Sequence, residues 1–110
     1  MARVSVKKPL AFEDEQRLLE KLFLALSSLG NWQEAEAFLV EFLTKEELAM
    51  LAKRLELYKR IQQKQRYREI MRALHVTAQT VSEARKKMKR AGVYFERILR
   101  KLQTLDRRLG

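Results

Sequence analysis

The sequence lacks cysteine and contains one histidine, one proline and three glycines. Without cysteine the chain forms neither disulfides nor thiolate metal sites, which suits a reducing compartment. A lone histidine, His75, excludes most zinc geometries and Ser-His-Asp catalysis, so we expect no enzyme activity, no metal and no cofactor. No apolar run has the length of a membrane span or the pattern of a signal peptide. We therefore expect a cytoplasmic protein without a membrane partner.

Positive charge dominates the chain and is concentrated in its second half. The formal net charge is +10, from 24 Lys and Arg against 14 Asp and Glu. Residues 1–52 carry six basic and nine acidic side chains, whereas residues 53–110 carry 18 and five. Such a field favours a polyanion, because each neutralised phosphate releases condensed counterions. By sign alone, an anionic membrane or an acidic protein would fit equally well.

Apolar residues recur at helical spacing along most of the 110 residues, which predicts an all-α protein. We expect a flexible basic N-terminus over residues 1–9 and a single domain over residues 10–110. The six predicted helices span about 10–29, 32–43, 45–64, 67–73, 78–91 and 93–109. Asn31 is a predicted N-cap of the second helix, and Thr44 with Glu47 forms a predicted capping box for the third.

Leucine-rich faces occur on the first, third and sixth predicted helices, and they are wide for a chain of this length. Large exposed apolar patches are uncommon on monomers. A homodimer that interleaves its helices is the simplest way to cover them. Trp32, near a helix start, is expected to be a core or dimer anchor.

A helix-turn-helix pattern covers residues 66–91, with a break at 74–76. Thr77 is placed to cap the second helix, and His75 is expected to tolerate an unusual backbone conformation rather than to bind a ligand. The apolar positions that would hold the two helices and the turn together are Ile70, Leu74, Val76, Val81 and Ala84.

The outer face of the second motif helix carries polar side chains that can address base edges in a major groove. The candidate base-reading residues are Thr77, Gln79, Thr80, Ser82 and Glu83. Long cations around this face suit phosphate contacts, which fix register without reading sequence. The candidate phosphate-contacting residues are Arg66, Arg68, Arg72, Lys86, Lys89 and Arg90. Tyr67 and Tyr94 flank the basic region. Contact with the backbone of a nucleic acid is one role open to them, but packing is the role we expect.

The order LTKEELAMLAKRLELYKRI, then REIMRALHVTAQTVSEARKKMK, resembles the tryptophan repressor superfamily, and within it the YerC/YecD-type branch of repressor-like proteins. The resemblance implies a six-helix fold in an intertwined homodimer. It also implies that the second motif helix enters the major groove of double-stranded DNA. Repression of transcription is the implied activity.

The resemblance further implies an effector pocket, with Leu43, Thr44, Arg54 and Tyr58 at matching positions. Arg54 matches an arginine that helps to hold the ligand, but the second pocket arginine of the family falls at Glu83. A carboxylate there would repel the carboxylate of an amino acid. Tyr58 stands where the family has a small aliphatic residue. We therefore expect a vestigial pocket that does not bind tryptophan, and hypothesise that Tyr58 fills the slot and holds the DNA-reading helices in place without ligand. The identity of any other effector stays open.

Taken together, the patterns predict a homodimeric, DNA-binding transcriptional regulator. One alternative is an RNA- or protein-binding adaptor that uses the same basic face, although RNA binding would favour more stacking aromatics there. A second is a small helical enzyme of the chorismate mutase type, whose site Arg54, Lys53 and Glu47 could imitate. Formation of prephenate from chorismate would discriminate that enzyme.

Overall fold

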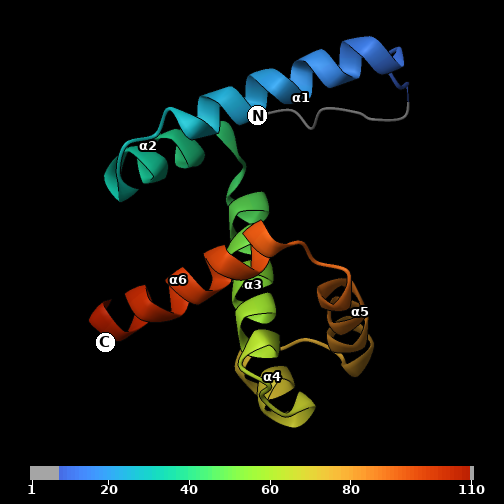
Figure 1. Cartoon of the computed structure of the whole chain (residues 1–110), viewed down its shortest axis with the longest axis vertical. Helices are drawn as coiled ribbons and strands as arrows, with labels where there is room; N and C mark the ends of the chain where they lie inside the picture. Colours follow the sequence, from blue (N-terminus) through green and yellow to red (C-terminus); the bar gives the residue numbers. More distant parts are fainter. Residues whose placement is uncertain (1–7, 110) are drawn as a thin grey trace. The chain divides into compact units, whose positions relative to one another are not determined.

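The computed structural model describes residues 8–109, with side chains from Lys8 to Asp106. Its described residues form six α-helices and no strand, which confirms the all-α prediction (Figure 1). The helices are α1 Phe12–Ser27, α2 Trp32–Phe42, α3 Lys45–Gln62, α4 Tyr67–Leu74, α5 Ala78–Lys89 and α6 Val93–Leu109. The predicted helix ends differ from these by at most two residues. Most of the predicted flexible N-terminus lies outside the described residues.

The contacts divide the chain into two units, residues 1–48 and residues 49–110. The first unit holds α1, α2 and the first turn of α3. The second holds the rest of α3 together with α4, α5 and α6. That residues 10–110 form one domain stays a prediction.

Side-chain caps start the second and third helices, as the sequence predicted. Asn31 Oδ1 accepts from the Glu34 N–H at 2.9 Å, and the Glu34 carboxylate accepts from the Gly30 N–H at 3.2 Å. Thr44 and Glu47 bond reciprocally: the Glu47 N–H donates to Thr44 Oγ1 at 3.1 Å, and the Thr44 N–H donates to Glu47 Oε1 at 2.9 Å. Each cap is worth about 1 kcal/mol, so these helix starts are fixed by local chemistry.

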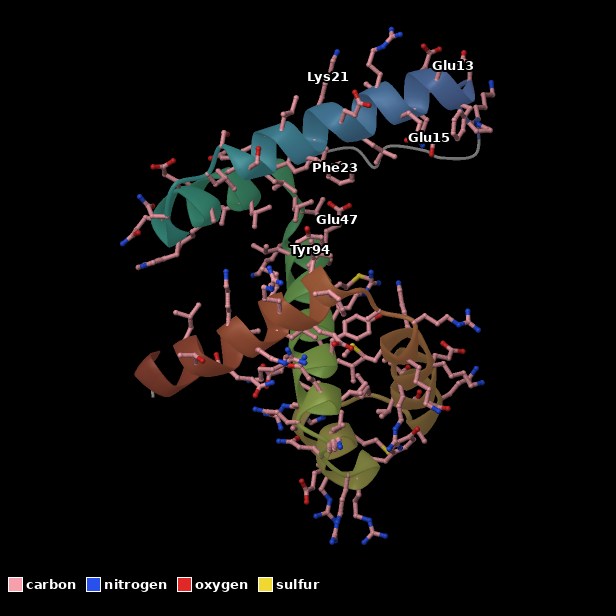
Figure 2. All side chains as sticks on the ribbon, in the orientation of Figure 1. Glu13, Glu15, Lys21, Phe23, Glu47 and Tyr94 are labelled. Carbon is pink, nitrogen blue, oxygen red and sulfur yellow. The ribbon has the colours of Figure 1, made fainter. Side chains whose placement is uncertain are left out.

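The first unit has no buried residue among its described positions. Many of its large apolar side chains lie open, including Phe23 at 60%, Leu24 at 68% and Trp32 at 69% exposure. Figure 2 shows Phe23 projecting from α1. Trp32 is therefore not a core residue of the single chain, and its expected role as a dimer anchor stays a prediction.

The hydrophobic core lies in the second unit and draws on all four of its helices. Its buried members are Leu57, Tyr58, Ile70, Val81, Ala84 and Leu99. Ile70, Val81 and Leu99 are at most 1% exposed. Burying side chains of this size contributes about 1.5–3 kcal/mol each, so the cluster is the main force that holds α4 and α5 against α3 and α6.

A polar seam joins α3 to α6 beside this core. The ammonium of Lys59, a residue only 8% exposed, bonds to Asp106 on α6 and lies 2.9 Å from Glu56 Oε1. Gln62 donates to a main-chain carbonyl of α6 at 3.0 Å and accepts from Gln103 Nε2 at 2.6 Å. Burial acts to lower the pKa of Lys59, but hydrogen bonds and charge from Asp106 and Glu56 outweigh it and raise that pKa.

Replacing Lys59 should destabilise the second unit in a pH-dependent way. We expect Lys59→Met to lower the free energy of unfolding by about 1–2 kcal/mol at neutral pH, because Asp106 loses its partner and Glu56 keeps only Arg60. The loss falls short of that for a fully buried pair because the Asp106 side chain is 37% exposed. Since the folded-state pKa is raised, the contribution of Lys59 is complete below its unfolded-state pKa of about 10.5 and disappears as pH rises through the folded-state value.

Urea denaturation at one protein concentration, at neutral and strongly alkaline pH, measures both effects. Arg100→Met is the matched control, because Arg100 is paired with Glu96 at 3.7 Å but is 70% exposed. Equal losses in the two variants would contradict the role given to the seam.

The turn between α4 and α5 depends on one residue in the left-handed region. His75 has φ 55° and ψ 50°, which confirms the unusual backbone expected for it. Leu74 completes the last turn of α4, so the break spans residues 75–77 instead of the predicted 74–76. A side chain in this region costs about 1–2 kcal/mol relative to ordinary helix, which makes the position sensitive to substitution.

We expect His75→Gly to raise the free energy of unfolding by about 0.5–1 kcal/mol, because glycine adopts positive φ without steric cost. Ala73→Gly, inside α4, should instead lower it by about 1 kcal/mol. Urea denaturation of both variants measures the two changes in the free energy of unfolding, which should have opposite signs. A destabilised His75→Gly protein would mean that contacts of the imidazole outweigh the backbone cost.

Candidate nucleic-acid interface

Helices α4 and α5 pack on each other through the residues that the pattern predicted. Ile70 of α4 is buried with Val81 and Ala84 of α5, and the half-buried Leu74 and Val76 pack against the same cluster. The short connection places the start of α5 directly after α4 (Figure 1). Because one side of α5 is buried, its opposite side faces outward.

Thr77 caps α5, as predicted. The Thr80 N–H donates to Thr77 Oγ1 at 3.2 Å, and the hydroxyl oxygens of the two threonines are 3.0 Å apart. The Thr77 oxygen already accepts a main-chain bond, so its first role is to hold the helix start. Thr80 is exposed on the first turn of α5.

Gln79 and Glu83 bond to each other on the outer side of α5. Gln79 Nε2 donates to Glu83 Oε1 at 3.2 Å, one helical turn away, and both residues are exposed. The bond orients the amide and leaves the Gln79 carbonyl oxygen and one N–H free. Those two groups are what an adenine edge requires. Ser82, also predicted to read bases, is half-buried.

The predicted phosphate contacts are all exposed, and they are free of ion pairs with the carboxylates that the structure describes. Described ion pairs involve Lys59, Arg60 and Arg100 instead. Nitrogen-tipped side chains project from α4 and α5 in Figure 2. Their charge is therefore available to an external anion.

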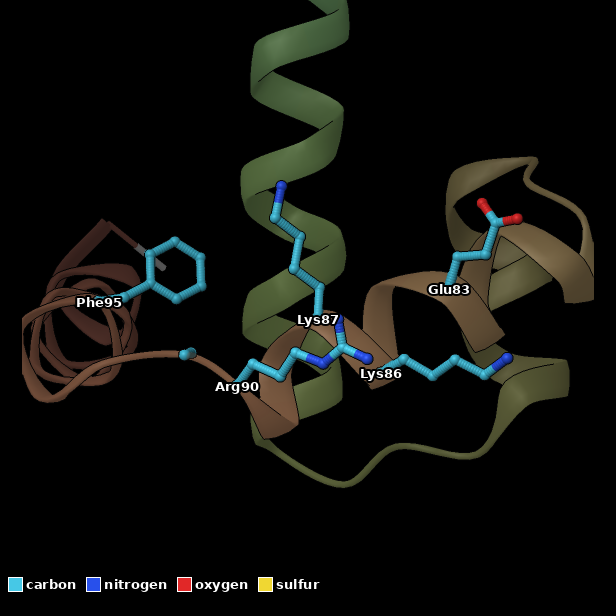
Figure 3. A pocket seen from close by; sticks show the side chains of 6 residues that line it. Glu83, Lys86, Lys87, Arg90 and Phe95 are labelled. Carbon is cyan, nitrogen blue, oxygen red and sulfur yellow. The ribbon is translucent and has the colours of Figure 1, made fainter.

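A pocket of about 610 Å³ opens between the later turns of α5 and the start of α6 (Figure 3). Figure 3 shows Phe95 on one side of it and Glu83 and Lys86 on the other. Three cations and one carboxylate surround an apolar floor, so its rim favours an anionic group. The lining residues are Glu83, Lys86, Lys87, Arg90, Ala91 and Phe95.

The residues of the predicted effector pocket are divided between the units. Leu43 and Thr44 belong to the first unit and Arg54 and Tyr58 to the second, so a shared pocket stays a prediction. Arg54 is exposed, whereas Tyr58 is 9% exposed and packs edge-to-face on Phe95 with ring centroids 5.3 Å apart. The ring of Tyr58 thus occupies space inside the core.

The sequence did not predict one side-chain contact between the two motif helices. The Arg85 guanidinium lies over the Tyr67 ring, 5.3 Å from its centroid. Hydrogen bonding from Arg85 lowers the pKa of the Tyr67 hydroxyl, burial opposes this, and Ser82 and the charges of Arg85 and Lys89 lower it further. No local sequence signal marks the pair, because it depends on how α4 and α5 cross.

Among the described residues, no three His, Cys, Asp or Glu side chains are grouped as metal ligands would be. None of the described helices combines the length and apolarity needed to cross a membrane.

In this short helix pair, one side of the second helix is buried, and cations that pair with no described carboxylate surround the other side. Such an arrangement is typical of helix-turn-helix proteins that bind nucleic acid. The fold and surface assign the chain to this class. The sequence model of the family described as Trp repressor protein matches residues 17–103, and the chain therefore belongs to that family. It is a family of DNA-binding transcriptional regulators rather than of enzymes. The predicted superfamily is confirmed, whereas the YerC/YecD-type branch stays a prediction. No curated protein and no solved structure matched the chain.

Two kinds of substitution on α5 should affect DNA binding differently. If Gln79 makes the predicted base contact, Gln79→Ala should lose about 1–3 kcal/mol on the preferred sequence and little on others. If Lys89 makes the predicted phosphate contact, Lys89→Ala should weaken binding to every duplex and reduce the salt slope by about one. Binding to duplexes that differ at single base pairs, over a range of salt, separates the two. A Gln79→Ala protein with the original preference would remove Gln79 from the base-reading set.

Proposed function

We propose that this protein is a sequence-specific, DNA-binding transcriptional regulator that acts as a homodimer and represses transcription in the cytoplasm. Tryptophan is not its effector. The observation that carries the proposal is the outer side of α5, where Gln79 and Glu83 are exposed and bonded to each other within a rim of unpaired cations.

The surface suits duplex DNA for two reasons. An ordered Gln79 amide offers a base edge both a donor and an acceptor, which supports sequence-specific reading. The exposed cations at the start of α4 and the end of α5, Arg68 and Lys89 among them, suit phosphates on either side of a groove. An RNA partner would favour stacking aromatics, but Tyr67 is half-buried and already covered by Arg85.

Exposed apolar side chains support the homodimer. No described residue of α1 or α2 is buried, and on α6 Ile98 and Leu105 are 54% and 50% exposed. Helices with such faces are normally stabilised by a partner that covers them. A two-fold pair of helix-turn-helix units would then read two half-sites about one helical turn apart, roughly 34–36 Å.

The absence of a tryptophan response rests on Tyr58 and Glu83. The Tyr58 ring packs against Phe95 in the core. The protein's own aromatic ring, rather than that of a ligand, therefore fills this space. Glu83 stands where the family resemblance implies the second pocket arginine, so a carboxylate replaces the cation that would hold the carboxylate of an amino acid. The helix pair is consequently held in place without a ligand.

Sedimentation and DNA binding of the full chain test the proposal together. We expect a dimer in solution, two chains per bound duplex, and duplex DNA preferred over duplex RNA of the same sequence at matched salt. Addition of L-tryptophan should leave the affinity for DNA within a factor of about two. A monomer that binds DNA would overturn the dimer, equal affinity for RNA would favour the adaptor, and tightening of tenfold or more by tryptophan would overturn the effector claim.

A further inference from the structure

The Tyr67–Arg85 pair forms a side-chain cluster on the edge of the helix-turn-helix, apart from the Gln79–Glu83 pair. Tyr67 is half-buried and packs against the hydrophobic core, which fixes its ring. Arg85 is exposed and lies over that ring. We propose that the Tyr67 hydroxyl and the Arg85 guanidinium together bind one phosphate of the DNA backbone. This inference rests on the proposed DNA-binding function and adds a phosphate site to it.

Helical periodicity places Arg85 on the correct strip of α5 for this role. Val81 and Ala84 mark the buried strip, and Gln79 and Glu83 mark the exposed strip that faces bases in the proposed function. Residues Ser82, Arg85 and Lys89 recur at spacings of three and four, so they form a strip between those two. Phosphates border the groove that holds a reading helix, so a donor on the flank of that helix meets the backbone rather than a base.

The position of Arg85 over the Tyr67 ring leaves it able to bind an anion. The Arg85 guanidinium lies 5.3 Å from the centroid of the Tyr67 ring, and a guanidinium has five N–H donors, more than one contact with a tyrosine uses. No described carboxylate pairs with Arg85 or Lys89. The tyrosine ring therefore orders the arginine without neutralising it, which reduces the entropy lost when a phosphate binds.

Two cations, Arg85 and Lys89, act on the Tyr67 hydroxyl. Hydrogen bonds from Arg85, and then the Ser82 hydroxyl and the charges of Arg85 and Lys89, lower the pKa of Tyr67 against the effect of burial. The same positive potential strengthens the hydroxyl as a donor and attracts an anion. A phosphodiester supplies two unesterified oxygens and one negative charge, and so can accept from both the hydroxyl and the guanidinium.

The chain contains a matched control of the same chemistry. Arg97 lies over the Tyr94 ring at 5.6 Å from its centroid, but both residues belong to α6 and Tyr94 is 78% exposed. Figure 2 shows Tyr94 at the start of α6, outside the helix-turn-helix. Tyr94→Phe and Arg97→Gln therefore remove equivalent groups without touching the proposed site.

The test is the affinity of full-length variants for one mixed-sequence DNA duplex over a range of salt. Tyr67→Phe keeps the ring and removes only the hydroxyl, so affinity should fall about 5- to 10-fold with an unchanged salt slope. Arg85→Gln should weaken binding about tenfold and reduce the slope by about one, because one fewer counterion is released. The double variant should lose less than the product of the single losses, because both groups bind the same phosphate.

Several results would overturn the proposal. Wild-type affinity in Tyr67→Phe, or losses in Tyr94→Phe and Arg97→Gln as large as those at Tyr67 and Arg85, would remove the site while the proposed function stands. A loss in Arg85→Gln without a change of slope would make Arg85 structural, and thermal unfolding of each variant would show whether folding is the cause. Failure of the unmodified protein to bind duplex DNA at any salt would overturn the proposed function itself.

Discussion

The burial of Ile70, Val81 and Leu99 in one cluster is the constraint on which the rest of the second unit depends. Helices α4 and α5 have eight and 12 residues, too few to be stable in water on their own propensity. They persist because their apolar sides pack on α3 and α6. That packing also fixes the direction of every other side chain on α5, so the core that stabilises the helix pair determines which residues face outward.

The cations on α4 and α5 stay unpaired among the described residues because most of the few acidic side chains of this unit bond elsewhere. Residues 53–110 contain five carboxylates. Glu56 and Asp106 hold Lys59, Glu96 pairs with Arg100, and Glu83 bonds to Gln79, which leaves Glu69. The cations of α4 and α5 are consequently unpaired among the described residues. In the first unit it is apolar side chains, rather than charges, that lack a partner, because many of them are exposed. The proposed partners of these two surfaces are a polyanion and a second chain.

Local chemistry explains why the sequence predicted so much of the fold. Caps at Asn31, Thr44 and Thr77 act within three residues, and they locate helix starts without tertiary information. Helix ends were less certain because they lack such signals, and Leu74 extended α4 beyond the expected break. The Tyr67–Arg85 pair and the Lys59–Asp106 bond join residues on different helices, so they depend on crossing angles that periodicity does not contain.

Selection of bound sequences from a randomised duplex DNA pool, at two salt concentrations, tests the central claim most directly. A dimer that presents two copies of α5 to DNA should enrich a two-fold symmetric site whose half-sites lie about one helical turn apart. Binding that weakens steeply with salt but enriches no sequence would contradict that claim. The basic surface would then bind polyanions without reading them.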